Sequence, residues 1–232
     1  MELTGVHFLL TYQCTFACDH CFVWGSPWQQ GSMSLADVDL VLDQAEELGT
    51  VQSVFFEGGE PFLYYATLVE AVRRAADRGF SVGVVSNGYW ATSIPDAVLY
   101  LRPMAGWINS LSISADFYHY TESQEERTHN ATMAASELGI PLGVICIAEP
   151  EGSGEGAVGQ IPHGESVVVF RGRAAEALSA RAPGQPFVSF TSCQHETLDD
   201  PGRIHVDCSG NVHVCQGVII GNVNDTPLKQ IW

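Results

Sequence analysis

The sequence predicts an α/β fold, because strand-like and helix-like segments alternate along most of the chain. Short apolar runs typical of buried strands are followed by longer segments with apolar residues at helical spacing. Several of these helical segments end at a glycine, a common residue just after a helix C-terminus. About six such β/α units are present, and their order predicts a parallel sheet with helices outside it. A closed barrel of eight units would need more residues than remain.

These patterns define the expected elements in chain order. Residues 9–13 end a first strand, and residues 35–48 form a helix that stops at Gly49. Ser93 opens another helix, because it is a good N-cap and a proline follows it closely. The other expected strands are 51–56, 80–86, 107–114, 142–148 and 166–170, and the other expected helices are 63–78, 122–138 and 173–182.

The composition excludes some classes of partner. The chain of 232 residues is 46% hydrophobic, which suffices for the core of one α/β domain with a short appendage. Its formal net charge is −17 and its single lysine is Lys229, so its surface repels nucleic-acid phosphates. No apolar run approaches the length of a membrane span. Seven cysteines without an export signal favour the reducing cytoplasm. We therefore expect neither a nucleic-acid nor a membrane partner.

The most informative motif is a group of three cysteines, Cys14, Cys18 and Cys21, spaced Cys-x-x-x-Cys-x-x-Cys. Three neighbouring thiolates can hold three corners of a cubic iron–sulfur cluster and leave the fourth iron open. A structural zinc site would need a fourth ligand, and His20 is a candidate. A disulfide framework suits small secreted proteins better than this chain. Plain core cysteines would be unusual at this density on a polar loop.

A second motif, Gly58-Gly59-Glu60-Pro61, follows the strand expected at residues 51–56. Two consecutive glycines allow a ligand to approach the backbone closely. An ordinary turn between a strand and a helix would also suit two glycines. The motif gains weight from its place at a strand end, about 35 residues after the cysteines.

Together the two motifs resemble those of the radical S-adenosylmethionine (SAM) superfamily, in which an aromatic residue such as Phe22 commonly follows the third cysteine. The resemblance implies a partial (β/α)6 TIM-type barrel and a 4Fe-4S cluster on Cys14, Cys18 and Cys21. SAM chelates the open iron in this family, and one electron cleaves it to methionine and a 5′-deoxyadenosyl radical. A donor such as flavodoxin or ferredoxin would supply that electron. The Gly58–Pro61 carbonyls would bind the SAM amino group, with the Glu60 carboxylate helping to position it.

Further SAM contacts are expected at the carboxyl ends of other strands, where active sites of parallel α/β folds lie. By resemblance, Ser86 and Asn87 would lie near the SAM carboxylate or ribose, and Ser112 or Ser114 near the ribose or methionine. Either Arg171 or Arg173 would pair with the SAM carboxylate, because guanidinium–carboxylate contacts are strong and directional. Each residue also has a structural alternative, since serines satisfy strand ends and arginines often occupy exposed helix starts.

Other strand-end residues are harder to assign. Tyr or His side chains just beyond a strand end could exchange protons or hydrogen atoms with a substrate, although packing under a loop is the commoner role. These residues are Tyr89, Trp90, Tyr118, His119 and Tyr120. The segment 149–164 is rich in glycine, so it predicts a loop or lid in place of a helix.

The C-terminal part carries a second group of cysteines and histidines. Alternating residues on both sides of residues 209–211 predict a β-hairpin. Its pattern resembles the start of a SPASM or twitch extension, which holds auxiliary 4Fe-4S clusters. Three alternatives stay open for Cys193, Cys208 and Cys215: an auxiliary cluster, a zinc site with histidine, or no metal. The alternation does not require the three sulfurs to converge, and Cys146 is expected to be plain core.

These observations predict a barrel domain at residues 1–185 and an extension at residues 186–232. The expected reaction is hydrogen abstraction from a substrate by the 5′-deoxyadenosyl radical. The resemblance of the C-terminal part favours a ribosomally made peptide as substrate. A small molecule, as in cofactor or natural-product assembly, is the alternative. A non-catalytic metal-binding or partner-recruiting module is the alternative from another class.

Overall fold

A computed structural model describes most of the chain. The described residues are 2–119, 123–148, 150, 165–166, 168–182, 184, 186, 188, 191, 193 and 197–232. Tyr120 and nearly all of the glycine-rich segment 149–164 lie outside them. Within them, no helix combines the length and apolar character needed to cross a membrane.

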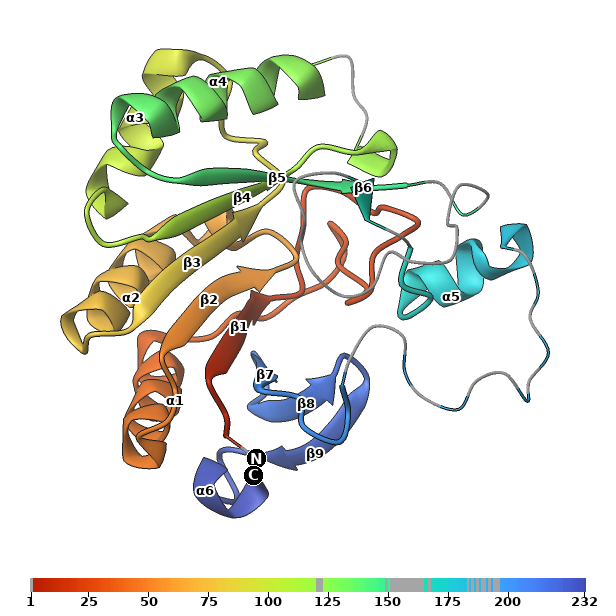
Figure 1. Cartoon of the computed structure of the whole chain (residues 1–232). Helices are drawn as coiled ribbons and strands as arrows, with labels where there is room; N and C mark the ends of the chain where they lie inside the picture. Colours follow the sequence, from red (N-terminus) through yellow and green to blue (C-terminus); the bar gives the residue numbers. More distant parts are fainter. Residues whose placement is uncertain are drawn as a thin grey trace.

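One sheet organises the described part of the chain (Figure 1). The strand order is β6-β5-β4-β3-β2-β1-β7-β8-β9, so β6 and β9 form its edges and the sheet is not closed. Strands β1 to β7 pair with one another in parallel, whereas β8 pairs antiparallel with both β7 and β9. The bounds are β1 (Gly5–Thr11), β2 (Ser53–Gly58), β3 (Ser81–Ser86), β4 (Ser110–Ser114), β5 (Leu142–Ile147), β6 (Glu165–Ser166), β7 (Arg203–Asp207), β8 (Asn211–Cys215) and β9 (Val218–Asn222). The predicted α/β fold with a mostly parallel sheet is therefore confirmed.

Helices α1 to α4 cover one face of this sheet (Figure 1). Alternate apolar residues of the central strands, such as Phe8, Phe56 and Val206, point to this face and form the main core with the helices. We call it the outer face, and the opposite one the inner face. The helices are α1 (Leu35–Leu48), α2 (Tyr65–Asp77), α3 (Ile94–Leu101), α4 (Gln124–Glu137), α5 (Arg173–Ala177) and α6 (Leu228–Ile231).

The helix boundaries follow from local chemistry. Ser34 caps α1 and forms a capping box with Asp37, and Gly49 ends the same helix in the left-handed conformation. Ser93 caps α3 as expected, because its side chain accepts a hydrogen bond from the backbone of Asp96.

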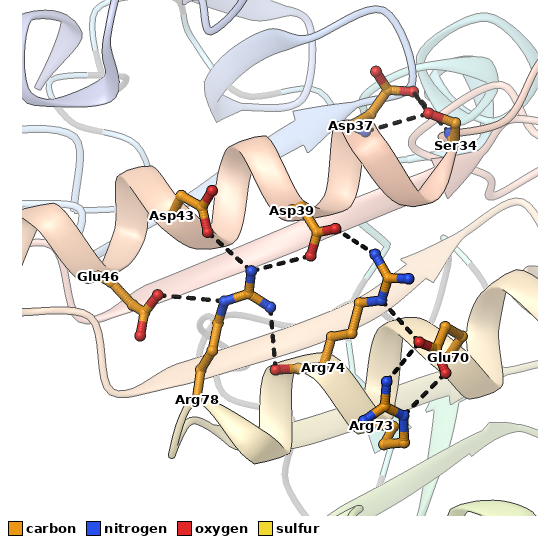
Figure 2. Close-up of polar contacts among 9 residues, drawn as sticks. All are labelled: Ser34, Asp37, Asp39, Asp43, Glu46, Glu70, Arg73, Arg74 and Arg78. Atoms are coloured by element: carbon orange, nitrogen blue, oxygen red, sulfur yellow. Dashed lines mark hydrogen bonds and ion pairs between the residues drawn. The ribbon is translucent and has the colours of Figure 1, made fainter.

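Ion pairs connect α1 and α2 on the outside of the molecule (Figure 2). Arg74 reaches Asp39 and Glu70, and Arg78 lies 3.0 Å from Asp39 and 2.9 Å from Asp43. Each such surface pair contributes only about 0–1 kcal/mol. These pairs therefore align the two helices while burial of their apolar faces supplies most of the stability.

Three predicted elements have a boundary that differs from the structure by three or more residues. The strand expected at residues 107–114 begins at Ser110, because a 3₁₀ turn and a glycine turn precede it. The strand expected at 166–170 is β6, and residues 168–170 lie outside any strand. The helix expected at 173–182 ends at Ala177 and continues as a 3₁₀ turn over Ser179–Arg181.

The predicted C-terminal hairpin is present, with His205 opposite His213 across β7 and β8. Strand β7 also pairs in parallel with residues Gly5 to Leu9 of β1. The hairpin thus extends the same sheet beyond β1, a contact that local sequence patterns do not reveal. The division of the chain at residue 185 stays a prediction.

Candidate functional site

The loop that carries Cys14, Cys18 and Cys21 follows β1 directly, at the carboxyl ends of the parallel strands. It folds back on itself, because Cys14 N donates to Ser26 O at 3.0 Å and Ser26 N donates to Tyr12 O at 3.2 Å. Cys14 and Cys18 are buried and Cys21 is half-buried. The three thiols are therefore held on one closed loop that is largely shielded from solvent.

Several hydrogen-bond donors point at the sulfurs of this loop. Gly25 N donates to Cys21 Sγ at 3.1 Å, while Phe16 N and Asn87 Nδ2 each donate to Cys14 Sγ at 3.5 Å. Such donors stabilise thiolates and set the reduction potential of iron–sulfur clusters. The arrangement suits sulfurs that carry negative charge.

In the metal-free loop, the thiolate charges are disfavoured. Burial raises the pKa of Cys14 to about 11, and the Phe16 N–H and Asn87 amide oppose this shift only in part. Burial also raises the pKa of Cys18, and the neighbouring Cys14 and Cys21 raise it further. Three neighbouring thiolates that repel one another, two of them buried, need a cationic partner. The donor set therefore fits a bound iron–sulfur group.

The sulfur spacing distinguishes this group from a single ion. Among the described residues, the three sulfurs do not all lie within 4.8 Å of one another. A lone zinc ion bound at about 2.3 Å would require tetrahedral sulfurs about 3.8 Å apart. A cubane binds each thiolate through a different iron, so the wider spacing favours the cluster over zinc.

The proposed fourth zinc ligand, His20, is engaged elsewhere. Its Nε2 lies 3.5 Å from Asp116 Oδ2, and its ring stacks on Tyr118 with centroids 4.5 Å apart. Asp116 in turn pairs with His119 Nδ1 at 2.8 Å. Burial lowers the pKa of His20 to about 4. This group ties the cysteine loop to the end of β4, a link that the sequence analysis missed although His20 lies between two cysteines.

Arg173 holds the cysteine loop by donating hydrogen bonds to backbone carbonyls of the loop. Its guanidinium donates to Cys18 O at 2.7 Å and to Gly25 O at 2.8 Å, and its own N–H donates to Cys21 O at 2.9 Å. The preceding Gly172 adopts φ 54°, and a Cβ there would lie 2.6 Å from Phe22 O. The structure thus places Arg173 on the loop carbonyls, while Arg171 Nη1 lies 3.5 Å from Gln216 Oε1.

The glycines of the second motif allow the cysteine loop to pack against it. A Cβ on Gly58 would lie 2.3 Å from Thr11 O, and one on Gly59 would lie 2.1 Å from Gln13 O. Gly59 N donates to Thr11 O at 2.7 Å, and Glu60 N donates to Gln13 O at 2.8 Å. The close approach in this structure is therefore between two backbone segments, and it fixes where the cysteine loop begins.

Glu60 is fully buried and joins this motif to the end of β3. Its carboxylate accepts hydrogen bonds from Phe62 N at 3.1 Å, Ser86 Oγ at 2.9 Å and Asn87 N at 2.8 Å. Burial raises the pKa of Glu60 to about 7, against the effect of these donors. Ser86 Oγ also accepts from Trp90 Nε1 at 2.9 Å. Glu60, Ser86 and Asn87 form one buried network beside the cysteine loop.

Two other predicted SAM contacts lie on the neighbouring strand β4, where Gln124 Nε2 links Ser114 O, at 3.2 Å, to Asn87 O, at 2.9 Å. Ser112 and Ser114 are half-buried on the inner face of β4, since their neighbours Leu111 and Ile113 belong to the outer core. Among the predicted SAM contacts, Asn87 reaches the cysteine loop directly. Its Nδ2 donates to Cys14 Sγ at 3.5 Å and to Thr15 Oγ1 at 3.1 Å. Their roles toward SAM stay predictions.

The C-terminal cysteines are dispersed. Cys208 packs against the outer core near Gly31, Cys215 is buried at the end of β8, and Cys193 is exposed. Among the described residues, they do not form a set of three ligands within 4.8 Å. The hairpin turn is held by Asp207, which accepts from Ser209 N, Asn211 N and the Tyr12 hydroxyl. Metal binding by these cysteines stays a prediction.

Comparisons with known proteins agree with this geometry. The model of the Radical SAM superfamily matches residues 8–146, more than half of the chain. The putative peptide biosynthesis protein YydG of Bacillus subtilis is 30% identical over 111 residues, which cover 47% of this chain and 35% of that protein. An S-adenosylmethionine-dependent nucleotide dehydratase of Selenomonas ruminantium is 29% identical over 83 residues, covering 36% and 29%. The chain thus spans about a third of the length of these curated relatives.

Solved structures share the fold at low sequence identity. BtrN in complex with AdoMet and 2-DOIA aligns with a TM-score of 0.60 and 15% identity, covering 100% of this chain and 82% of that one. Streptococcus suis SuiB bound to the precursor peptide SuiA aligns with a TM-score of 0.55 and 15% identity, covering 100% and 64%. The three-cysteine loop, the adjoining buried network and the family match lead to one conclusion: the chain belongs to the radical SAM superfamily.

Proposed function

We propose that this chain is a radical SAM enzyme that abstracts hydrogen from a peptide substrate, with its cluster on Cys14, Cys18 and Cys21. The observation that carries the proposal is the closed loop of three buried or half-buried thiols, in which Cys14 and Cys21 accept hydrogen bonds from N–H donors. When bound, the cluster supplies one electron for reductive cleavage of SAM to a 5′-deoxyadenosyl radical. A small electron carrier such as flavodoxin or ferredoxin would deliver that electron.

The residues of this chain would bind, orient and shield the reacting groups. The three thiolates hold the cluster, and Arg173 keeps the loop closed by binding the carbonyls of Cys18 and Gly25. The buried Glu60 network keeps the end of β2 beside the end of β3. In this proposal, the backbone carbonyls of Gly58 to Pro61 accept hydrogen bonds from the SAM amino group.

The remaining SAM contacts are proposed from position. Ser112 and Ser114 face the inner side of the sheet, where the ribose or methionine part of SAM would lie. Asn87 adjoins the cluster through Cys14, so its neighbourhood suits the SAM carboxylate. Arg171 is the better candidate for a carboxylate partner, because both ends of the Arg173 guanidinium already donate to the loop.

A peptide substrate is favoured over a small molecule by two similarities. YydG is described as a putative peptide biosynthesis protein, and SuiB was solved with its precursor peptide. BtrN and the nucleotide dehydratases support the small-molecule alternative. A non-catalytic metal-binding module, the alternative from another class, would bind a cluster without cleaving SAM.

Isotope transfer separates these three functions. The chain, reconstituted without oxygen, is incubated with SAM, reductant and a deuterated candidate peptide, chosen by a search of the neighbouring genes for a short precursor-peptide reading frame. Deuterium should appear in 5′-deoxyadenosine, and the peptide should change in mass. Cleavage of SAM that is independent of the peptide and transfers no deuterium would contradict the peptide proposal. Absence of any cleavage by a chain that holds its cluster would support the non-catalytic module.

A further inference from the structure

Three metal-ligating side chains meet on the inner face of the sheet, away from the cysteine loop. His7 lies on β1, Glu57 on β2 and His205 on β7, which are adjacent strands. The register places His7 directly opposite His205, and Glu57 opposite Leu9, two residues further along β1. Alternation directs all three away from the outer core, since their neighbours Val6, Phe56 and Val206 belong to it. We call these three residues the inner triad.

The donor atoms of the inner triad are close together. Glu57 Oε1 lies 3.3 Å from His7 Nδ1 and 3.2 Å from His205 Nε2, and all three donors lie within 4.8 Å of one another. The His7 ring stacks on Phe55 at 4.7 Å, which fixes its orientation. The carboxylate thus lies between two imidazoles that come from separate strands.

The two imidazoles are close polar partners of the Glu57 carboxylate. Both His7 Nδ1 and Glu57 Oε1 are shut off from solvent, and neither makes a well-aligned hydrogen bond among the described residues. Buried polar atoms usually have a partner, and an unsatisfied carboxylate oxygen is costly. A positive charge between the two nitrogens and the oxygen, from a metal ion or from the proton of an imidazolium, would satisfy all three atoms.

The separations match those of a coordination shell. Nitrogen and oxygen ligands about 2.0–2.2 Å from zinc occupy tetrahedral positions about 3.3–3.5 Å apart. The two measured separations, 3.2 and 3.3 Å, are close to this value. Two histidines and one glutamate are also a donor set that zinc uses when it keeps an open coordination position.

The second set of close ligands in the described residues differs from the inner triad in the contacts of its carboxylate. In His20, Asp116 and His119, the Asp116 carboxylate has a hydrogen bond of 2.8 Å to His119 and accepts from the backbone of Tyr118 and His119. That group links the loop to β4, and like the inner triad it has two buried atoms without a hydrogen-bond partner among the described residues, His20 Nδ1 and Asp116 Oδ2. The inner triad has no comparable set of backbone donors among the described contacts.

We propose that His7, Glu57 and His205 form a mononuclear site for a divalent transition-metal ion, with zinc as the test ion. His7 would bind through Nδ1, His205 through Nε2 and Glu57 through Oε1. The fourth position would be left to water or to an oxygen of a ligand on the inner face. This site is separate from the cluster and does not depend on radical chemistry.

The test uses the full chain with Cys14, Cys18 and Cys21 changed to Ala, so that no cluster can form on the loop. Calorimetric titration with zinc should give one tight site per chain. Glu57→Gln and, separately, His7→Asn should each weaken that site by more than about 100-fold, beyond the 10–100-fold typical of outer-shell changes. Asp116→Asn, which alters the other close ligand set, should leave zinc affinity unchanged.

Cobalt substitution and thermal unfolding provide the second measurement. Cobalt bound to the inner triad should show visible ligand-field bands without the near-ultraviolet thiolate charge-transfer band. Thiolate bands would place the metal on Cys193, Cys208 or Cys215 and overturn the proposal. So would the absence of zinc binding, or equal binding by Glu57→Gln. If either Glu57→Gln or His7→Asn does not fold, the other variant decides. Zinc should raise the melting temperature of the parent chain but not that of the folded variant.

Discussion

The chain has two groups of three cysteines, and the structure treats them differently. In the loop after β1, the thiols share one closed turn, receive N–H donors and are held by Arg173. In the C-terminal part, Cys208 faces the outer core, Cys215 ends β8 and Cys193 is exposed. The comparison teaches that the surrounding backbone distinguishes the two groups, although each of them has three thiols.

The largest expected effect comes from breaking the backbone contact that positions the first group. In Gly59→Ala, the new Cβ would lie 2.1 Å from Gln13 O, and neither backbone can move aside cheaply. We expect a loss of about 3 kcal/mol or more in unfolding free energy, measured by urea denaturation of the metal-free chain. Gly210→Ala is the matched change in the hairpin, where the Cβ meets the movable end of Asn224. It should cost about 1–2 kcal/mol, and an equal loss would contradict the account.

The next effect concerns pH and the buried Glu60 network. Burial raises the pKa of Glu60 from 4.5 to about 7, so the folded state holds its proton more tightly than the unfolded state. The stability from this group is complete below about pH 4.5 and is lost as pH rises to about 7. The free energy of unfolding should fall across this window by up to about 3 kcal/mol more in the parent than in Glu60→Gln. Parallel pH profiles for the two chains would show that Glu60 does not titrate there.

Arg173 tests whether the loop must be held closed. Arg173→Gln removes most of the donors to Cys18 O and Gly25 O, so the reconstituted cluster should be lost faster to a chelator. We expect roughly a tenfold faster loss, since hydrogen bonds from a charged donor contribute about 1.5–3 kcal/mol. Iron release followed by absorbance measures this rate. Arg102→Gln, at an exposed position, is the control, and similar rates for both variants would refute the role.

The smallest effect concerns a hydrogen bond between the cysteine loop and the C-terminal hairpin. The Tyr12 hydroxyl donates to Asp207 Oδ2 at 3.1 Å, which connects the start of the cysteine loop to the hairpin. Tyr12→Phe should lower the unfolding free energy by about 0.5–1.5 kcal/mol. In an Asp207→Asn background the same change should cost less, because the charged acceptor is absent. A full additive loss in the double variant would show that this hydrogen bond contributes nothing.

Much of the fold and part of the site followed from local patterns. The β/α alternation, the cysteine loop and the hairpin turn each depend on neighbouring residues, so sequence spacing predicted them. The pairing of β7 with β1 depends on contacts between residues about two hundred positions apart, which no local pattern encodes. The same reason hid the inner triad, whose members come from three strands. The contacts of Arg173 with the cysteine loop were also hidden from the sequence, because its partners are backbone carbonyls about 150 positions away.

The central claim is that the first cysteine group, and not the second, carries the radical chemistry. Two chains test it directly: one with Cys14, Cys18 and Cys21 changed to Ala, and one with Cys193, Cys208 and Cys215 changed to Ala. After oxygen-free reconstitution, SAM cleavage to 5′-deoxyadenosine should be abolished in the first chain. The second should keep both cleavage and the roughly four irons of one cubane. Cleavage that persists in the first chain would contradict the account, because its electron would then come from another site.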